Sequence, residues 1–457
     1  MRYDANHFMR RRTFLSRLNA PQLIAASFAL GILAGGALLA LPFVQAPGAR
    51  VTPLQALFTA TSALCVTGLS VVDIGKAFNV AGQFVILLLM QAGGLGIITL
   101  GTLFAFLAGQ RLGFGQRARL AEQLSAGQVG GVVPLLSSIV KYIFVIEGIG
   151  ALLLYVRLGP EEGWLRGLYH SIFHAVSAFN NAGFSLYTDS FTRFRGDAWI
   201  NTVMCALILL GSLGFLVMFN LVAWRRDRRK NPLTTQTKIM LLMTATLFAL
   251  GVASVALFEW NNPRTLGSLP ATEKIVAIVF QGTSPRTAGF NSIDYSALHP
   301  ATLLITIFLM FIGGGPGSTA GGIKMTTFFV IVIAAWSFLR GRGEPIAFSR
   351  RIDADTILRA LVVTVVSFAL VNGAVLVLVL TNPKVPLINL LFETVSAFGT
   401  VGLSMNTTPI LSPAGHLLLI VLMYLGRIGP LTFAVALSLR SERSAVTYPA
   451  EKSILVG

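Results

Sequence analysis

Long apolar runs alternate with short polar segments along the whole chain. A run of about 20 apolar residues can cross the roughly 30 Å hydrocarbon core of a bilayer as a helix. Such runs cover residues 23–41, 78–107, 132–156, 199–224, 239–258, 301–339, 356–380 and 416–439. The pattern predicts eight membrane-spanning segments, and the predicted fold class is an all-α integral membrane protein.

A shorter apolar segment lies between the two spans of each successive pair. These segments cover residues 53–65, 164–180, 271–285 and 387–398. Each is too short to cross the bilayer and leads into a strip of three residues that ends on glycine. A polar stretch follows, and the second span then returns the chain to a basic loop. The repeating unit is therefore a span, a short re-entrant helix, a glycine strip and a second span.

The sequence around the strips occurs in recognisable form four times. The strings begin at Phe58, Phe173, Phe280 and Phe392. Self-similarity of this kind indicates a repeat architecture, and its period is too long for a soluble solenoid. The third string is one residue shorter than the others between its serine, Ser284, and its glycine. Any fourfold symmetry is therefore expected to be approximate.

Basic residues gather in alternate segments between the spans, as the positive-inside rule requires of cytoplasmic loops. With 54% hydrophobic and 12% charged residues, the chain leaves no room for a soluble domain. The net charge of +17 therefore reflects orientation in the membrane, and no nucleic-acid partner is predicted. The clusters are Arg10, Arg11, Arg12 and Arg17; Arg111, Arg117 and Arg119; Arg225, Arg226, Arg228, Arg229 and Lys230; Arg340, Arg342, Arg350 and Arg351; and Arg440 and Arg443.

Both ends of every unit lie on the basic side, so the four units run parallel and both termini are expected to be cytoplasmic. A cytoplasmic segment, residues 1–20, precedes four pore repeats, and a cytoplasmic tail, residues 441–457, follows them. The predicted repeats cover residues 21–110, 111–225, 226–340 and 341–440. Four parallel units would place four glycine strips at one depth around a common axis.

The glycine strips are the candidate ion-binding site. Irregular backbone survives in a bilayer only where it is buried in protein or lines a watery cavity, and its carbonyls can replace the hydration shell of a cation. Glycine reaches otherwise strained conformations and puts no side chain into a lumen. The C-terminal ends of the short helices would add partial negative charge. The candidate residues are Val66, Thr67 and Gly68; Asn181, Ala182 and Gly183; Thr287, Ala288 and Gly289; and Thr400, Val401 and Gly402.

This arrangement resembles the Trk/Ktr/HKT superfamily of potassium transporters over residues 23–439, nearly the whole chain. Eight spans, without an additional N-terminal pair, are most similar to the Ktr-type membrane subunit. Glycine in all four strips resembles the potassium-selective members, since sodium-favouring plant relatives carry serine at the position of Gly68. The resemblance implies potassium uptake across the plasma membrane, with potassium held at the strips. It also implies a homodimer on a cytoplasmic ring of nucleotide-binding regulatory subunits that contact the basic segments.

The second span of the third unit is interrupted by residues 313–324, which contain Pro316 and six glycines: Gly313, Gly314, Gly315, Gly317, Gly321 and Gly322. Such a composition predicts an unwound segment near mid-membrane depth. A plain kinked helix is one alternative. A phosphate-binding loop is another, but Ile323 interrupts the motif and no strand precedes it. In the resembled superfamily this loop obstructs ion passage until it is regulated, so we expect it to be the gate.

Two cations accompany this loop, Lys324 and Arg427. A charge inside the membrane is costly unless it is solvated or paired, and an unwound loop offers exposed carbonyls to an arginine. The resemblance likewise places an arginine of the last span against the loop. The alternative is that Arg427 extends to the inner membrane interface.

Several polar residues in apolar surroundings have open roles. Thr59, His174, Gln281 and Glu393 hold one equivalent position in the short helices and could support the strips or simply pack between helices. Glu147 has no evident partner, although Arg286 or Lys324 could serve. Arg286 could face the outer mouth or stabilise its own short helix. His170 and His174 have a metal-compatible spacing without a third ligand. Asp73, Asp189 and Asp294 could make the entrance negative or cap turns.

Two alternatives to potassium uptake remain at this point. One is a sodium-coupled or sodium-permeable cation transporter of the same fold, with Na⁺ as an activating or coupling ion. The other is an integral-membrane enzyme acting on a lipid-linked substrate, but the clustered acids or nucleophile–base pair that it needs are not evident. No cofactor is expected on this chain, and its remaining partner is membrane lipid.

Overall fold

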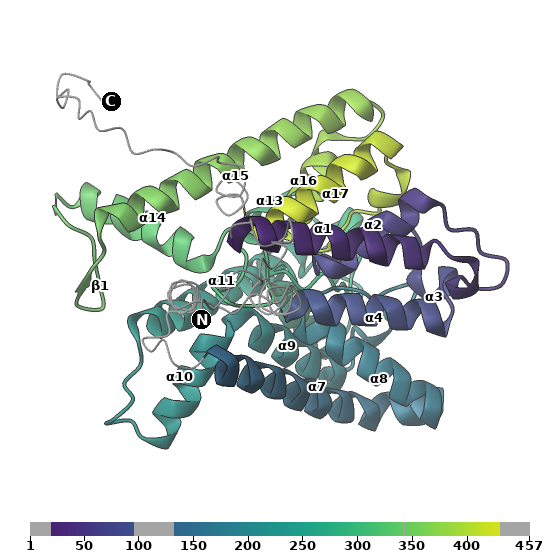
Figure 1. Ribbon diagram of the computed structural model, residues 1–457, viewed down its shortest axis with the longest axis horizontal. Coiled ribbons are helices and arrows are strands. Elements are labelled where there is room, and N and C mark those ends of the chain that lie inside the picture. Colours follow the sequence, from purple (N-terminus) through teal and green to yellow (C-terminus); the bar gives the residue numbers. More distant parts are fainter. Residues whose placement is uncertain (1–19, 96–131, 342, 430–457) are drawn as a thin grey trace, which may run out of the picture.

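The computed structural model describes residues 20–95, 132–341 and 343–429. Predictions for the N-terminal segment, the 111–119 basic cluster, the ends of the runs 78–107 and 416–439, the cluster of Arg440 and Arg443, and the C-terminal tail lie outside these residues. The regular structure of the described part is helical, apart from one hairpin of two short strands, Ile346–Ala347 (β1) and Arg350–Arg351 (β2). Figure 1 shows the helices gathered around a common centre, with α7 to α9 on one side and α15 to α17 on the other.

Four described helices are long and apolar enough to cross a membrane: α1 (Ala20–Leu39), α7 (Val132–Glu162), α11 (Thr235–Glu259) and α15 (Ala354–Thr381). They coincide with the predicted first span of each unit. Their outer faces carry exposed apolar side chains such as Leu152, Leu257 and Phe368, as expected of a surface in contact with lipid. An all-α membrane protein is therefore confirmed, while the full set of eight spans stays a prediction.

Each long helix is followed by a short one that packs against it: α2 (Pro53–Leu64), α8 (Trp164–Phe179), α12 (Ala271–Thr283) and α16 (Leu387–Gly399). The phenylalanine that opens each repeated string is completely buried in its short helix. The local sequence explains where these helices begin. Thr52 and Gln55 form a reciprocal capping box at the start of α2, and proline residues precede α12 and α16.

Shorter elements complete each unit. The helices that follow the strips are α4 (Val80–Gly94), α9 (Ala198–Leu213), α10 (Phe215–Arg226), α13 (Pro300–Phe311), α14 (Met325–Leu339) and α17 (Pro413–Ile428). Single turns lie in the loops: η2 (Pro42–Val44), α3 (Ile74–Ala77), η3 (Thr192–Phe194), η4 (Tyr295–Ala297) and η5 (Thr408–Ile410).

The run over residues 199–224, predicted as a span, consists of two helices with a sharp bend between them. The chain bends by 100° between α9 and α10, at Gly214, whose φ is +91°. Loop 313–324 lies directly against this break, since Phe215 N donates to Gly317 O at 3.1 Å. A Cβ atom on residue 214 would lie 2.7 Å from the carbonyl oxygen of Pro316. Both the backbone conformation and the close approach therefore require glycine here.

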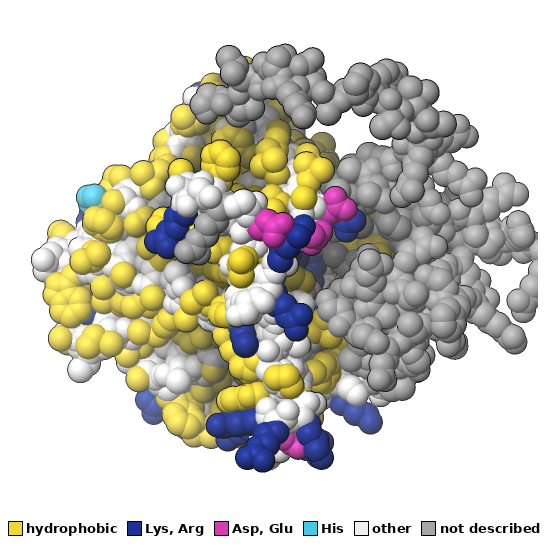
Figure 2. All heavy atoms as spheres, turned by 90° about the vertical axis from the view of Figure 1, so that its left-hand side faces the viewer, with side chains coloured by type: hydrophobic (Ala, Val, Ile, Leu, Met, Phe, Trp, Pro, Cys, Tyr) yellow, Lys and Arg dark blue, Asp and Glu magenta, His cyan; other side chains and the backbone are white. Residues whose placement is uncertain are grey.

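The basic elements lie on one side of the molecule. Figure 2 shows Lys and Arg side chains gathered on the face that is at the left of Figure 1, with apolar surface on its flanks. The elements on that side include α10, the end of α14 and the hairpin. These elements and the turns that directly follow α10 and α14 contain the described members of the clusters at 225–230 and 340–351.

A buried carboxylate joins the C-terminal end of α11 to α13. Glu259 is fully buried and accepts four hydrogen bonds of 2.6–2.8 Å, from Asn262 Nδ2, Thr265 Oγ1, His299 N and Thr302 Oγ1. Because each buried donor left unpaired costs about 1–3 kcal/mol, we expect Glu259→Ala to lower the unfolding free energy by at least about 3 kcal/mol. Thermal unfolding in detergent measures this effect. The control Glu344→Ala removes an exposed ion pair with Arg351 and should cost under about 1 kcal/mol.

Candidate functional site

The four glycine strips meet in a closed ring. A Cβ atom on Gly68 would lie 2.6 Å from Ala182 O, one on Gly183 would lie 3.0 Å from Ala288 O, and one on Gly289 would lie 2.5 Å from Val401 O. A Cβ on Gly402 would overlap Thr67 O and close the circle. The carbonyl of each middle residue therefore faces the glycine of a neighbouring strip. The predicted convergence of four strips on one centre is observed in these contacts.

The strips share one backbone conformation. The first residue of each has a positive φ, namely Val66 (57°), Asn181 (57°), Thr287 (66°) and Thr400 (48°). The last residue of each also has a positive φ, namely Gly68 (94°), Gly183 (69°), Gly289 (75°) and Gly402 (93°). A left-handed conformation is unfavourable for β-branched residues and persists only where the surroundings enforce it. The surroundings here enforce it at Val66, Thr287 and Thr400, while Asn181 adopts it more readily.

A serine of each short helix holds its own strip in place. Thr67 N and Val401 N each donate at 2.8 Å to the carbonyl of Ser62 and Ser396, respectively, and Ala182 N does so at 2.7 Å to Ser177. In the third unit Ala288 N donates to Ser284 O at 3.0 Å, across one residue fewer. The third unit thus accommodates its missing residue with a shorter turn at the end of α12, and Gly289 still lies in the ring with the other strip glycines.

Side-chain oxygens at the strips lack partners. Thr67 Oγ1, Asn181 Oδ1, Thr287 Oγ1 and Thr400 Oγ1 are buried without a hydrogen bond from the described residues. Buried polar atoms are almost always paired, so such a group calls for an explanation, for example an unobserved ion or water. Their concentration at the ring fits a site that holds a polar ligand.

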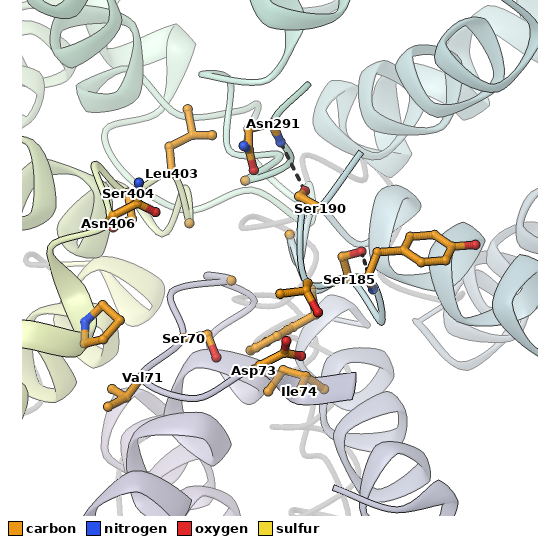
Figure 3. A pocket seen from close by; sticks show the side chains of 18 of the residues that line it. Ser70, Val71, Asp73, Ile74, Ser185, Ser190, Asn291, Leu403, Ser404 and Asn406 are labelled. Atoms are coloured by element: carbon orange, nitrogen blue, oxygen red, sulfur yellow. Dashed lines mark hydrogen bonds between the residues drawn. The ribbon is translucent and has the colours of Figure 1, made fainter. Parts of the chain in front are cut away.

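An open hollow of about 310 Å³ lies on the glycine side of the ring (Figure 3). It is lined by all four strip glycines and by the loops that follow them. Hydrogen bonds join these loops, as from Asn291 N to Ser190 Oγ (3.3 Å) and from Asn406 Nδ2 to Asp294 Oδ1 (3.3 Å). Asp73 and Asp294 belong to the lining, which includes no lysine or arginine. The hollow is thus suited to a cation.

The same acidic residues also stabilise turns. Asp73 and Asp294 accept hydrogen bonds from backbone N–H groups two residues further along the chain. Asp73 Oδ2 also pairs with Lys76 Nζ at 3.6 Å, and Asp189 pairs with Arg193 Nη2 at 2.7 Å. Partial burial acts to raise the pKa of Asp189, but the hydrogen bonds and charge of Arg193, together with a backbone hydrogen bond at Asp189 itself, hold this pKa below its ordinary value. Turn capping is therefore observed at Asp73 and Asp294.

Three of the four equivalent polar residues in the short helices contact the loop after their own strip. His174 Nε2 accepts from Leu186 N at 3.3 Å, and Gln281 Nε2 donates to Ile293 O at 3.3 Å. Glu393 accepts from Ser404 Oγ and, at 2.8 Å, from Thr408 Oγ1. Thr59 instead bonds within its helix, to Gln55 O. In units two to four these side chains therefore hold the loop that follows the strip, rather than only packing between helices.

Loop 313–324 has a closed base. Ile312 and Ile323 form a parallel bridge, and Gly313 N donates to Ile323 O at 2.8 Å. Lys324 Nζ donates to Ala320 O at 2.6 Å, inside the loop. The segment preceding the loop is helical, so a strand–loop phosphate site is ruled out, and α13 and α14 are separate helices rather than one kinked helix.

The loop contacts two strips on the side opposite the hollow. Asn181 Nδ2 donates to Thr319 Oγ1 at 2.8 Å, and a Cβ on Gly321 would overlap Thr400 Oγ1. Arg427, which is buried, donates from Nη1 to Thr319 O and from Nη2 to Gly93 O at 2.5 Å. The expected contact between Arg427 and the loop is therefore present, and the side chain does not extend to the interface. Thr319, which no sequence pattern singled out, accepts hydrogen bonds from both Asn181 and Arg427.

The other buried charges have partners that the sequence did not indicate. Glu147 accepts hydrogen bonds from Gln91 and Asn180, not from Arg286 or Lys324. Arg286 is buried and lies against Thr244 and Met325, so it does not face the outer mouth. Among the described residues no three His, Cys, Asp or Glu side chains gather as metal ligands, and His170 pairs with Glu162 at 2.6 Å.

Comparison with known proteins decides the family. The cation transport protein (TrkH) family model matches residues 36–446. The chain belongs to this family. It is 43% identical to the Ktr system potassium uptake protein B of Bacillus subtilis over 95% of this chain and 96% of that protein. The corresponding protein of Vibrio alginolyticus is 42% identical over 96% and 95%.

Two further members extend the comparison. The potassium/sodium uptake protein NtpJ of Enterococcus hirae is 41% identical over 96% of this chain and 98% of its own. The crystal structure of the potassium transporter TrkH from Vibrio parahaemolyticus superposes with a TM-score of 0.71 at 18% identity, covering 95% and 87% of the chains. The resemblance to the Trk/Ktr group is confirmed. These relatives are ion transporters, which removes the membrane-enzyme alternative.

Proposed function

We propose that this family member takes up potassium ions through the ring of glycine strips. The single observation that carries the proposal is the closed ring itself, in which four middle-residue carbonyls face neighbouring glycines. Carbonyl oxygens in such a ring can replace the hydration shell of a potassium ion. Relatives at 42–43% identity named potassium uptake proteins support this choice of ion.

In this proposal an ion enters from the hollow lined by Asp73 and Asp294 and loses its water at the strips. The C-terminal ends of α2, α8, α12 and α16 lead directly into the strips, so their partial negative charge favours a cation there. The membrane potential contributes about 2.3 kcal/mol per charge per 100 mV to inward movement.

Loop 313–324 is the proposed gate. Its residues contact strips two and four on the inner side, and Arg427 and Lys324 donate to its carbonyls. With these contacts formed, the loop lies across the exit from the ring. Opening requires the loop to leave Asn181, Thr400 and Arg427.

For the arrangement in the membrane and the assembly with partners, we propose what the sequence predicts. Four pore repeats and eight spans cross the plasma membrane, with the basic face of Figure 2 in the cytoplasm. Two copies form a dimer on a ring of nucleotide-binding subunits that contact this face. Membership of a two-component system is supported by the name of the first two relatives, each a protein B of a Ktr system.

A sodium-permeable transporter is the second candidate, favoured by the name of the NtpJ relative, a potassium/sodium uptake protein. Glycine at all four strips supports potassium as the main ion. Na⁺ would then act as an activating or coupling ion.

Growth of a potassium-uptake-deficient bacterial strain tests the proposal. The chain, expressed with a regulatory subunit of a Ktr system, should restore growth at limiting K⁺, and without that subunit it should do so less well. Na⁺ is varied separately. Absence of rescue by a protein that is present in the membrane would contradict the proposed function, and rescue only of Na⁺ uptake would favour the second candidate.

A further inference from the structure

Helix α10 ends in a cluster of basic residues that has no role in the ion pathway described so far. Arg225, Arg226, Arg228, Arg229 and Lys230 fall within six positions, and all five are exposed. The one acid among them, Asp227, pairs with Lys230 at 3.8 Å. Among the described residues the four arginines form no ion pair. The cluster therefore presents a net charge of +4, five bases less one acid.

The direction of α10 places this cluster at the surface of the membrane. α9 returns the chain from the strips towards the basic side, and α10 is bent from it by 100°. In Figure 1 α10 lies at the edge of that side and points away from the centre of the molecule. A helix perpendicular to a returning span lies along the membrane plane instead of crossing it.

The end of α10 combines apolar and basic surface. Val222 is 53% exposed. Trp224 is partly exposed, and the guanidinium of Arg228 stacks 4.5 Å from the centre of its ring. Tryptophan prefers the boundary between lipid and water. An apolar helix in the membrane plane with a basic end is typical of binding to an anionic lipid surface.

The loop 227–234 folds back on α10 and fixes the cluster in place. Asn220 Nδ2 donates to Pro232 O at 3.3 Å, and Thr234 N donates to Asn220 Oδ1 at 3.0 Å. Asp227 Oδ1 accepts from the backbone N–H groups of Arg229 and Lys230, both at 3.0 Å. The basic side chains therefore extend from a hydrogen-bonded turn, which lowers the entropy lost when they bind a partner.

The other end of α10 is bonded to the proposed gate. Three backbone hydrogen bonds join the corner between α9 and α10 to loop 313–324: Phe215 N to Gly317 O (3.1 Å), Gly315 N to Ser212 O (3.0 Å) and Thr319 N to Gly211 O (3.3 Å). A displacement of α10 therefore acts directly on the loop.

We propose that the basic end of α10 binds anionic phospholipid headgroups of the cytoplasmic leaflet and thereby holds loop 313–324 closed. Guanidinium groups form paired hydrogen bonds with phosphate, and each arginine near an anionic surface strengthens binding roughly fivefold. The position of α10 at the edge, its exposed Val222 and Trp224 favour lipid over a protein partner at this cluster. Binding fixes the corner to which the loop is bonded. The inference rests on the proposed orientation and gate.

Quenching of Trp224 fluorescence measures the lipid contact and does not depend on transport. The full-length protein is reconstituted in phosphatidylcholine vesicles with an equal mole fraction of brominated phosphatidylglycerol or of brominated phosphatidylcholine. Trp224→Phe, measured in parallel, gives the part of the signal that belongs to Trp224. We expect the anionic lipid to quench this part at least about twofold more strongly. Screening by about 0.5 M NaCl should remove the excess.

Two pairs of substitutions test the arginines. Arg225→Gln with Arg226→Gln leaves the stacked Arg228 in place and should lower the excess quenching by at least about half. Arg228→Gln with Arg229→Gln should do the same, which keeps the test open if one variant fails to fold. The matched control, Arg264→Gln with Lys384→Gln, removes two exposed bases from the loops after α11 and α15 and should keep the excess.

Flux of ⁸⁶Rb⁺ into proteoliposomes without a regulatory subunit tests the link to the gate. Wild-type flux should be about threefold lower in vesicles with phosphatidylglycerol than in neutral vesicles. The surface potential of this lipid concentrates cations and by itself raises flux, and it acts on every variant alike. Both arginine pairs should lose the decrease, and the control pair should keep it.

Equal quenching by both lipids in the wild type would overturn the inference, as would an excess that survives both arginine pairs or high salt. If the arginine pairs changed only the response to an added regulatory subunit, the cluster would be a protein interface and the inference would be wrong. A lipid contact without any effect on flux would overturn the link to the gate. If the wild type carried no Rb⁺ in any vesicle, the proposed function would fail, while the quenching would still decide the lipid contact.

Discussion

Gly402→Ser should abolish selective potassium uptake, with a loss of at least about tenfold in the K⁺-over-Na⁺ ratio. Gly402 has a φ of 93°, and a Cβ on it would overlap Thr67 O and lie 3.0 Å from Gly68 Cα. Both contacts are with backbone, which cannot move aside as a flexible side chain can. The carbonyl of Thr67, which would bind the ion, is therefore displaced together with Gly68. Flux of K⁺ and Na⁺ into proteoliposomes measures the ratio.

Gly373→Ala is the matched control for this substitution. Gly373 lies in α15 of the same repeat, and a Cβ on it would meet no atom within 4 Å. Alanine also favours the helical conformation by roughly 0.5–1 kcal/mol, so the control should fold and transport as the wild type does. Gly68→Ser provides a second test from another unit, where the Cβ would lie 2.6 Å from Ala182 O. Wild-type selectivity in both serine variants would refute the assignment of the strips.

Arg427→Gln should raise unregulated potassium flux by about tenfold or more. The guanidinium donates to Thr319 O in the loop and to Gly93 O in α4, and hydrogen bonds from a charged donor contribute about 1.5–3 kcal/mol. Their loss favours the conformation in which the loop has left the ring. The measurement is ⁸⁶Rb⁺ uptake into proteoliposomes without any regulatory subunit.

A partial deletion of the loop gives an independent test of the gate. Removing residues 317–320 deletes Thr319 and its contacts with Asn181 and Arg427 and should raise flux in the same direction. Arg340→Gln is the control, because this arginine is exposed and stacks on Trp336, far along α14 from the loop. Unchanged or reduced flux through folded loop variants would show that residues 313–324 do not obstruct the pathway.

The repeat pattern predicted most of the architecture because its signals are local. Twenty-residue apolar runs and shorter ones that end at glycine are visible in the chain without knowledge of its neighbours. The predicted positions of α2, α8, α12 and α16 accordingly differ from the observed ones by one or two residues. The strips could be recognised for the same reason, because a comparison of the four repeated strings within the sequence is enough to find them.

Contacts between units could not be predicted in this way. The break at Gly214 depends on Pro316 and Gly317, about 100 residues further along the chain. Thr319 looks like an ordinary loop residue until Asn181 and Arg427 are placed around it. A charged partner was conceivable for Glu147, but the structure shows hydrogen bonds from the amides of Gln91 and Asn180. Gln91, a polar residue within the apolar run 78–107, was the sequence signal for this contact.

Locating the ion in the protein shows directly whether the ring binds it. Crystals grown in Rb⁺, a close substitute for K⁺, give an anomalous signal that marks each bound ion. We expect the strongest peaks on the axis of the ring, between the carbonyls of Thr67, Ala182, Ala288 and Val401. Peaks confined to other parts of the molecule, with an empty ring, would show that the strips are not the ion-binding site.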